Sequence, residues 1–172
     1  MARWTYTLTT LFALAAWAGA QGPVPAPPPS TADQLRLLKA NSTLIDHLVD
    51  SGVALSAESR ALVRVQKCYG ASSALATAIR EAVGKQDADR VAELADLFVD
   101  VVRGALIKTL DDAKTMVPPE SPDAEKVKAL RGRSADDVRE LKAAIPATGK
   151  VADNARVQLA LTQFDVLAER LK

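Results

Sequence analysis

The sequence predicts an all-α protein, folded as a mostly antiparallel, up-and-down helical bundle of four to five helices with coiled-coil-like packing. Strong helix formers (alanine, leucine, lysine, arginine and glutamate) dominate the chain after Ser30. Apolar residues recur there every three to four positions, and no segment shows the alternation of period two that marks a strand. Turn signals divide this region into five segments, each of which is expected to be one helix.

The first helix is expected from Thr31 to Ser51. Thr31 followed by Gln34 has the spacing of a capping box at the start of a helix. Gly52 stands where a left-handed residue commonly ends a helix. The expected inner stripe consists of Leu35, Leu38, Ser42, Ile45 and Val49, with Leu48 beside it.

The second helix is expected from Ser56 to Val83, with Gly84 at its end. Its apolar residues follow a strict alternation of three and four, which is typical of a coiled-coil seam. The seam consists of Leu62, Val65, Tyr69, Ser72, Ala76, Ile79 and Val83. Because the connection at Lys85-Gln86 is very short, the second and third helices should form an antiparallel hairpin.

The third helix is expected to begin after Asp87, a favourable N-cap, and to continue to about Met116. Val117-Pro118-Pro119 should stop it, since proline cannot continue a helix. Its apolar face is the widest in the chain, which predicts contacts with two or more neighbours and a place near the centre of the bundle. That face consists of Val91, Leu94, Phe98, Val101, Val102, Ala105, Leu106 and Leu110.

The fourth helix is expected to start at Ser121-Pro122, a cap followed by proline at the first helical position. One apolar face continues through Gly132, so a single helix is favoured over a break with a new start at 134–137. The face consists of Val127, Leu130, Ser134, Val138, Leu141 and Ile145, and the helix closes at Pro146 and Gly149.

The last helix is expected from about Lys150 to the end of the sequence. Its shared face consists of Asn154, Val157, Leu161, Phe164, Ala168 and Leu171. Asn154 is the one polar member of this face. It is interpreted as part of a solvated first turn, and the alternative is a buried amide that fixes the helix register.

The first twenty residues have the layout of a secretory signal peptide. Arg3 supplies a positive charge, an apolar run follows, and Ala18-Gly19-Ala20 is a small-residue cleavage site. We therefore expect a signal peptide at 1–20, a proline-rich linker at 21–30 and the helical bundle domain at 31–172. The mature protein would be secreted or periplasmic. The alternative is a retained membrane anchor, but the apolar stretch is short and carries four threonines.

The charge and the aromatic content exclude several function classes. The chain has 22 basic and 21 acidic residues, and removal of Arg3 with the leader leaves the two signs balanced. A neutral chain lacks the positive surface needed for nucleic acid or an anionic membrane. Only Tyr69, Phe98 and Phe164 remain outside the leader as aromatic residues, too few for stacking on bases or flat cofactors. We expect no nucleic-acid partner, no membrane partner after signal cleavage, and no cofactor.

No familiar catalytic motif occurs in the sequence. It contains no G-x-S-x-G elbow, no phosphate-binding glycine loop and no H-E-x-x-H zinc motif. His47 is the one histidine, and helical spacing places Asp50 beside it. The favoured interpretation is a surface histidine; the alternatives are a metal ligand or a catalytic pair with Asp50. Acidic pairs such as Asp111-Asp112 and Asp136-Asp137 are interpreted as solvated helix faces.

Cys68 is the one cysteine of the sequence, so no disulfide can form within the chain. It lies between the seam residues Val65 and Tyr69. We interpret it as a small buried hydrophobic residue, with a reactive or intermolecular role as the alternative.

Gly70 and Gly104 are expected within about one helical turn of each other across the hairpin. Small residues surround both, so the two backbones are expected to pack closely there. The alternative is a thin place in the core that a small ligand or a metal would fill.

These observations favour an exported, non-enzymatic protein that acts through helix-face protein–protein interaction, as a scaffold, adaptor or chaperone-like binder. Self-association through an exposed helix face is part of this hypothesis. The alternative is a bundle that binds a small ligand or a metal near the level of Gly70 and Gly104. A third hypothesis is an enzyme that uses His47 with Asp50, and replacement of His47 by alanine would separate it from the first.

Overall fold

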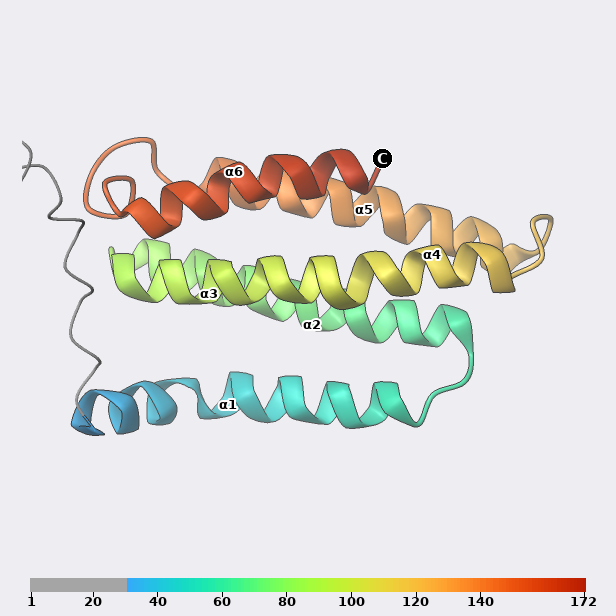
Figure 1. Cartoon of the computed structure of the whole chain (residues 1–172), viewed down its shortest axis with the longest axis horizontal. Helices are drawn as coiled ribbons and strands as arrows, with labels where there is room; N and C mark the ends of the chain where they lie inside the picture. Colours follow the sequence, from blue (N-terminus) through green and yellow to red (C-terminus); the bar gives the residue numbers. More distant parts are fainter. Residues whose placement is uncertain (1–30) are drawn as a thin grey trace, which may run out of the picture. The chain divides into compact units, whose positions relative to one another are not determined.

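The computed structural model describes residues 31–172, and every regular element in that range is a helix. The expected signal peptide and proline-rich linker lie outside the described residues. The elements are α1 (Thr31–Ser56), α2 (Ala61–Gly84), α3 (Ala88–Val101), η1 (Val102–Leu106), α4 (Ile107–Met116), α5 (Pro122–Ala144) and α6 (Ala155–Arg170). Since α3, η1 and α4 form one continuous helix, the prediction of an all-α bundle of five helices is confirmed (Figure 1). The contacts divide the chain after Lys39, and the packing below is that of residues 40–172.

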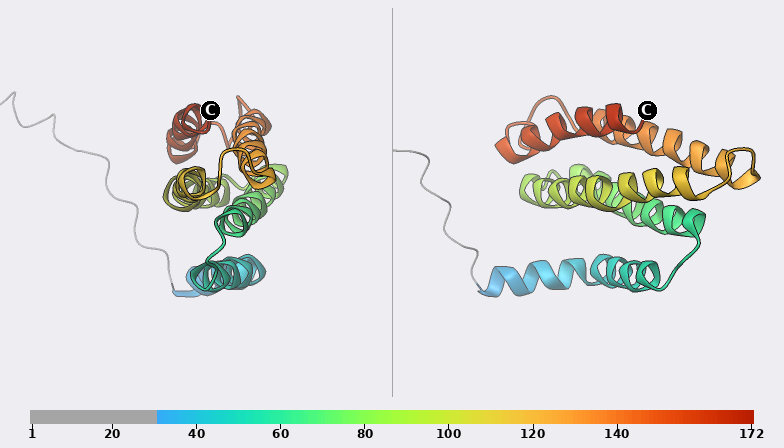
Figure 2. Two further views of the ribbon diagram at one scale, coloured as in Figure 1. Left: turned by 90° about the vertical axis from the view of Figure 1, so that its right-hand side faces the viewer. Right: turned by 45° about the vertical axis from the view of Figure 1, so that its right-hand side comes forward.

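Helices that follow one another in the chain run in opposite directions (Figure 1). In the core of the bundle α2 contacts α3, η1, α4 and α5, and α6 contacts α3 and α5. Two pairs of neighbouring helices therefore run in the same direction: α3 lies beside α6, and α2 lies beside α5 (Figure 2, left). Side-chain pairs between the α3–η1 segment and α6 with its N-cap advance together along both helices, which confirms their common direction. These pairs are Asp89 with Asn154, Asp96 with Arg156, and Arg103 with Gln163.

The two largest fully buried side chains of the core connect the hairpin of α2 and α3 with the hairpin of α5 and α6. Phe98 of α3 and Phe164 of α6 are both almost fully buried and meet edge to face, with ring centroids 5.4 Å apart and an interplanar angle of 70°. Such T-shaped pairs place the positive ring edge against the negative ring face. Both residues belong to the apolar faces expected from the sequence, so the helix pattern correctly identified this part of the core.

The end of α1 differs from the sequence prediction. The helix continues through Gly52, whose φ is not positive, and ends at Ser56, where the Ser56 hydroxyl donates a 2.7 Å hydrogen bond to the Val53 carbonyl. Glycine in a helix costs only about 1 kcal/mol relative to alanine, and the apolar residues beyond it continue the helix.

The inner stripe predicted for α1 is also wrong over the part whose side chains are described. Leu44, Leu48 and Leu55 pack against the core, whereas Ile45 and Val49 are exposed. Leu44, Leu48 and Leu55 lie on one side of the helix, and Ile45 and Val49 lie about 80–120° from the middle of that side at 3.6 residues per turn. Both faces have helical spacing, so periodicity alone could not select the one that packs.

The second helix starts five residues later than expected, at Ala61. The Glu58 carboxylate accepts hydrogen bonds from the Arg60 backbone N–H at 2.9 Å and from the Arg60 guanidinium at 2.9 and 3.0 Å. These bonds hold Arg60 in an extended conformation, and the helix begins after it. The expected seam is confirmed: Val65, Ser72, Ala76 and Ile79 are buried, and its other members are half-buried.

The third helix begins and ends as expected. The Asp87 carboxylate accepts from the Arg90 backbone N–H at 3.1 Å, and Val117 leaves the helix in an extended conformation before the two prolines. The π-helical turn η1 in its middle was not expected; there the Ile107 N–H donates to the Val102 carbonyl. A π turn inserts one residue and shifts the apolar face, which keeps Leu106, Ile107 and Leu110 in the core.

The fourth helix is a single helix, α5, which continues through Gly132 without a break. The Ser121 hydroxyl accepts from the Ala124 N–H at 3.2 Å, and Pro122 follows at the first helical position, as expected. The last helix starts at Ala155 instead of Lys150. Asn154 is its N-cap, because its side-chain oxygen accepts from the N–H groups of residues 156 and 157 at 3.0 and 3.3 Å. Neither interpretation of Asn154 from the sequence anticipated this role.

Candidate functional sites

His47 and Asp50 both lie exposed on α1. None of the hydrogen bonds and ion pairs described for residues 31–172 joins them, and no group of three or more His, Cys, Asp or Glu residues in that range is arranged to hold a metal ion. His47 lines an open groove of about 380 Å³, whose other lining residues are Thr43, Leu44, Ala74, Thr77, Ala78, Glu81 and Arg90. Within the described range, the geometry supplies no partner that would orient His47 as a general base.

Cys68 is buried in the core on α2, as its place between Val65 and Tyr69 predicts. Burial raises the pKa of the Cys68 thiol, and a hydrogen bond with the Thr109 side chain opposes this effect only in part. A thiol with a raised pKa is mainly protonated near neutral pH, and the thiolate is the nucleophilic form. The structure therefore gives Cys68 the character of a packed core residue. It does not bring Cys68 into contact with His47 or Asp50, which lie exposed on α1.

Gly70 and Gly104 do not form the site considered from the sequence. Both are exposed, and a Cβ atom built on either one meets no atom within 4 Å. The glycines thus mark neither a close approach of two backbones nor a thin place in the core. They lie outside because the seam residue Tyr69 and the buried Val102 occupy the inward positions near them.

A small cavity does lie on the inner side of the helices near this level. It measures only about 10 Å³, which is room for at most one water molecule. Ser72, Ser134 and Asp137 supply its polar lining, together with Ser73. Burial, and next a hydrogen bond with Asp137, raise the pKa of the neighbouring Tyr69. This place is part of the packing of α2 and α5 against α3 and η1, and it has no room for an organic ligand.

One member of each acidic pair noted in the sequence has a basic partner, whereas Asp137 is half-buried and lines the small cavity instead of a solvated face. Asp136 pairs with Arg139 at 2.7 Å, and Asp96 pairs with Arg156 at 2.7 Å. Asp111 pairs with Arg131 of α5. All these pairs are at least partly exposed, so each contributes little to stability.

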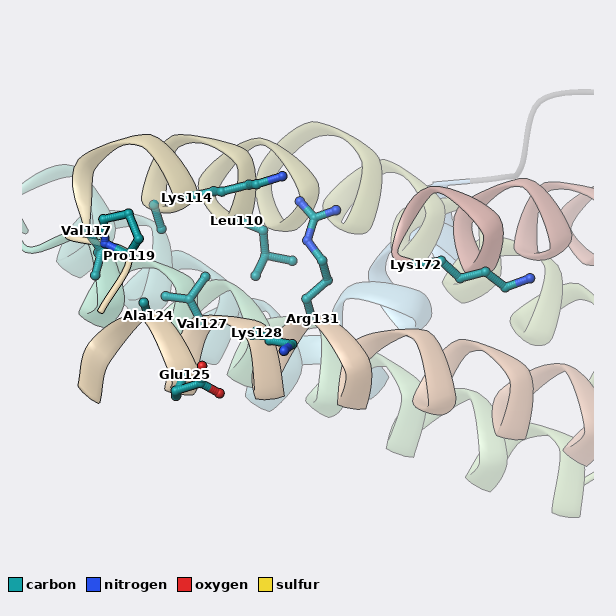
Figure 3. Close-up of a pocket in the computed structure, with 11 residues that line it drawn as sticks. Leu110, Lys114, Val117, Pro119, Ala124, Glu125, Val127, Lys128, Arg131 and Lys172 are labelled. Atoms are coloured by element: carbon teal, nitrogen blue, oxygen red, sulfur yellow. The ribbon is translucent and has the colours of Figure 1, made fainter. Parts of the chain in front are cut away.

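A pocket of about 430 Å³ opens where α4 leads into α5, and no pattern in the sequence predicts it. Its floor is apolar and includes Leu110, Ala113 and Val127, all buried. Figure 3 shows Leu110 and Val127 between the two helices, with Lys114 on α4 above Leu110 and Arg131 extending from α5 beside it. The full lining is Leu110, Ala113, Lys114, Val117, Pro119, Ala124, Glu125, Val127, Lys128, Arg131 and Lys172. Periodicity could not reveal this pocket, because it depends on how far two helices separate before the turn that joins them.

Exposed apolar side chains are grouped on α1. Ile45, Val49 and Val53 are 37%, 57% and 65% exposed, and we call these three residues the outer stripe. A smaller group on α6 consists of Leu159 and Val166, one heptad apart. With Leu44, Leu48 and Leu55 on its packed side, α1 is apolar over about half of its circumference, at about 100° per residue.

No protein-family model, curated protein or solved structure matches this chain. Among the described helices, none combines the length and the apolar character that a membrane span requires.

Proposed function

We propose that this protein is exported and acts without catalysis, as a scaffold, adaptor or chaperone-like helical bundle that binds a protein through a helix face. The bound protein is either a second copy of the chain or another protein. One observation carries the proposal: α1 packs on the core with Leu44, Leu48 and Leu55 and presents the outer stripe to solvent. A helix that is apolar on two sides is typical of a helix between two packing partners.

The outer stripe is large enough to anchor an interface but not to form one alone. Full burial of a valine or isoleucine side chain contributes about 1.5–3 kcal/mol, and these three are already partly covered. Association costs at least about 4 kcal/mol, and a stable interface buries roughly 800 Å² on each partner. Residues beside the stripe must therefore take part, and the stripe is expected to be the centre of the contact.

The balanced charge and the small number of aromatic residues support a protein partner over a nucleic acid. Export is supported by the basic start, the apolar run and the small-residue site in residues 1–20. We expect the mature chain, recovered outside the cytoplasm, to begin at Gln21 on N-terminal sequencing. A chain that is found only in the cytoplasm with Met1 retained would contradict export.

The interaction is tested by light scattering and by affinity capture on the chain without residues 1–20. The test variant is Val49→Lys with Val53→Lys, which places two charges on the outer stripe. The matched control is Ala129→Lys with Ala143→Lys, which adds the same charges at exposed positions of α5. Circular dichroism should show the same helix content for all three proteins.

If the partner is a second copy, the unchanged chain should have a mass above that of one chain, and only the outer-stripe variant should fall to the single-chain mass. If the partner is another protein, the unchanged chain and the control should retain it from the native host, and the outer-stripe variant should lose it. A single-chain mass with nothing retained would contradict the proposal. So would a partner that the outer-stripe variant retains equally well.

A further inference from the structure

We infer that the pocket between α4 and α5 is a binding site for a single-chain carboxylate amphiphile, that is, a free fatty acid. This site lies apart from the outer stripe of α1 and is independent of the proposed protein interaction. Its volume of about 430 Å³ falls within the range of small-molecule pockets, about 300–1,000 Å³. The three features that select the ligand are the apolar floor, the charge of the rim and the opening to solvent.

The floor of the pocket suits an alkyl chain. Leu110 and Ala113 of α4 and Val127 of α5 line it, and all three side chains are buried at the base. Ala113 and Ala124 face the pocket with single methyl groups, so the space between the helices is left open there. An alkyl chain that entered this space would exchange contact with water for contact with apolar side chains. The affinity should therefore fall about fourfold for each methylene removed from the chain.

The rim of the pocket selects an anion. Four basic side chains line it, against the one carboxylate of Glu125. Arg131 is paired with Asp111, and Lys172 is paired with Glu169. Lys114 and Lys128 have no ion pair among those described for residues 31–172, so their charges remain available to a ligand.

These two lysines stand on opposite helices. Lys114 lies in the last turn of α4, and Lys128 lies near the start of α5. Both line the pocket, Lys114 from its α4 side and Lys128 from its α5 side (Figure 3). A carboxylate at the rim would be attracted by the positive charge of both helices while its alkyl chain occupies the base. Lysine binds carboxylates and phosphates as a point charge, so a head group of modest size suffices.

The test is calorimetric titration of the whole chain with monomeric dodecanoate. We expect saturable binding of one dodecanoate, weaker binding of decanoate by up to about fifteenfold, and no detectable binding of dodecyltrimethylammonium, which has the same chain and the opposite charge. No saturable binding of dodecanoate, or equal binding of the cationic amphiphile, would overturn the inference.

Variants locate the site. Lys114→Gln with Lys128→Gln should weaken dodecanoate at least tenfold and leave the binding of dodecanol unchanged. The matched control is Lys108→Gln with Lys126→Gln, which removes two exposed charges from the same two helices outside the pocket lining and should bind as the unchanged chain does. Ala124→Phe should abolish binding by filling the space between the two helices.

Thermal unfolding identifies any variant that fails to fold, and Ala124→Leu then replaces Ala124→Phe as the filling variant. Unchanged affinity in the double lysine variant, or an equal loss in the control, would contradict the assignment of the site.

Discussion

The contact of Phe98 with Phe164 gives the sharpest test of the packing between the two hairpins. Phe164→Ala removes a ring that is 0% exposed and lies 5.4 Å from the Phe98 ring, centroid to centroid. Truncation of a buried phenylalanine to alanine costs about 3–5 kcal/mol. Natural domains are stable by about 5–15 kcal/mol, so this one change should remove a large share of the total.

Urea unfolding, followed by the helical circular dichroism signal, measures the effect. With a typical urea dependence of about 2 kcal/mol per molar, a loss of about 4 kcal/mol lowers the midpoint by about 2 M. Leu159→Ala on the same helix is the control, because Leu159 is 60% exposed and its truncation should cost no more than about 0.5 kcal/mol.

A double-mutant cycle with Phe98→Leu and Phe164→Leu then isolates the ring pair and should give a coupling of about 0.5–1.5 kcal/mol. A cost below 1 kcal/mol for Phe164→Ala, or no coupling in the cycle, would refute the described packing of α3 on α6.

Three further predictions concern α1, α2 and the connection between them. Gly52→Ala should raise the free energy of unfolding by about 0.5–1 kcal/mol in urea titration, because Gly52 is helical with open space for a Cβ; a loss would indicate a left-handed helix end there. The Glu58 carboxyl should titrate near pH 2 in carbon NMR, because hydrogen bonds from Arg60 lower its pKa to about 2; Arg60→Gln should return it toward 4.5. Cys68 should react with a thiol reagent only as fast as the protein opens, and rapid native labelling would contradict its burial.

The Glu58 prediction has a defined consequence for stability. The pKa of Glu58 is lowered in the folded state, so the contribution of its bonds to Arg60 is fully present above the unfolded pKa near 4.5. That contribution is lost as the pH falls toward 2. In Arg60→Gln, stability should change less over this acidic range than in the unchanged chain.

The sequence predicted those helix ends that are set by a capping residue and its immediate neighbours. Asp87 before α3 and Ser121-Pro122 before α5 are strong signals, and both are used as caps. The end of α1 and the start of α6 were misplaced where two signals competed. Gly52 is a helix-ending signal, but the apolar residues after it continue the helix to Ser56. Asn154 has the spacing of the apolar face of α6, but it acts as the N-cap of that helix.

The features that the sequence did not predict depend on which helix faces meet in the folded chain. The periodicity of α1 fits Ile45 and Val49 as well as Leu44 and Leu48, and only tertiary packing decides between them. Tertiary packing also produces the pocket between α4 and α5 and the π turn at 102–106. The burial of Cys68 was predictable, because it lies one helical turn from both Val65 and Ser72, which belong to the seam.

Photo-crosslinking in the native host tests the central claim most directly. A photoreactive phenylalanine analogue is placed at Val49 in the outer stripe, and at Ala129 of α5 in a matched control; both positions are exposed. We predict that Val49 crosslinks to protein, either a second copy or one defined partner, and that Ala129 does not. A chain that stays uncrosslinked from Val49, or that crosslinks equally from both positions, would contradict a function carried by this face.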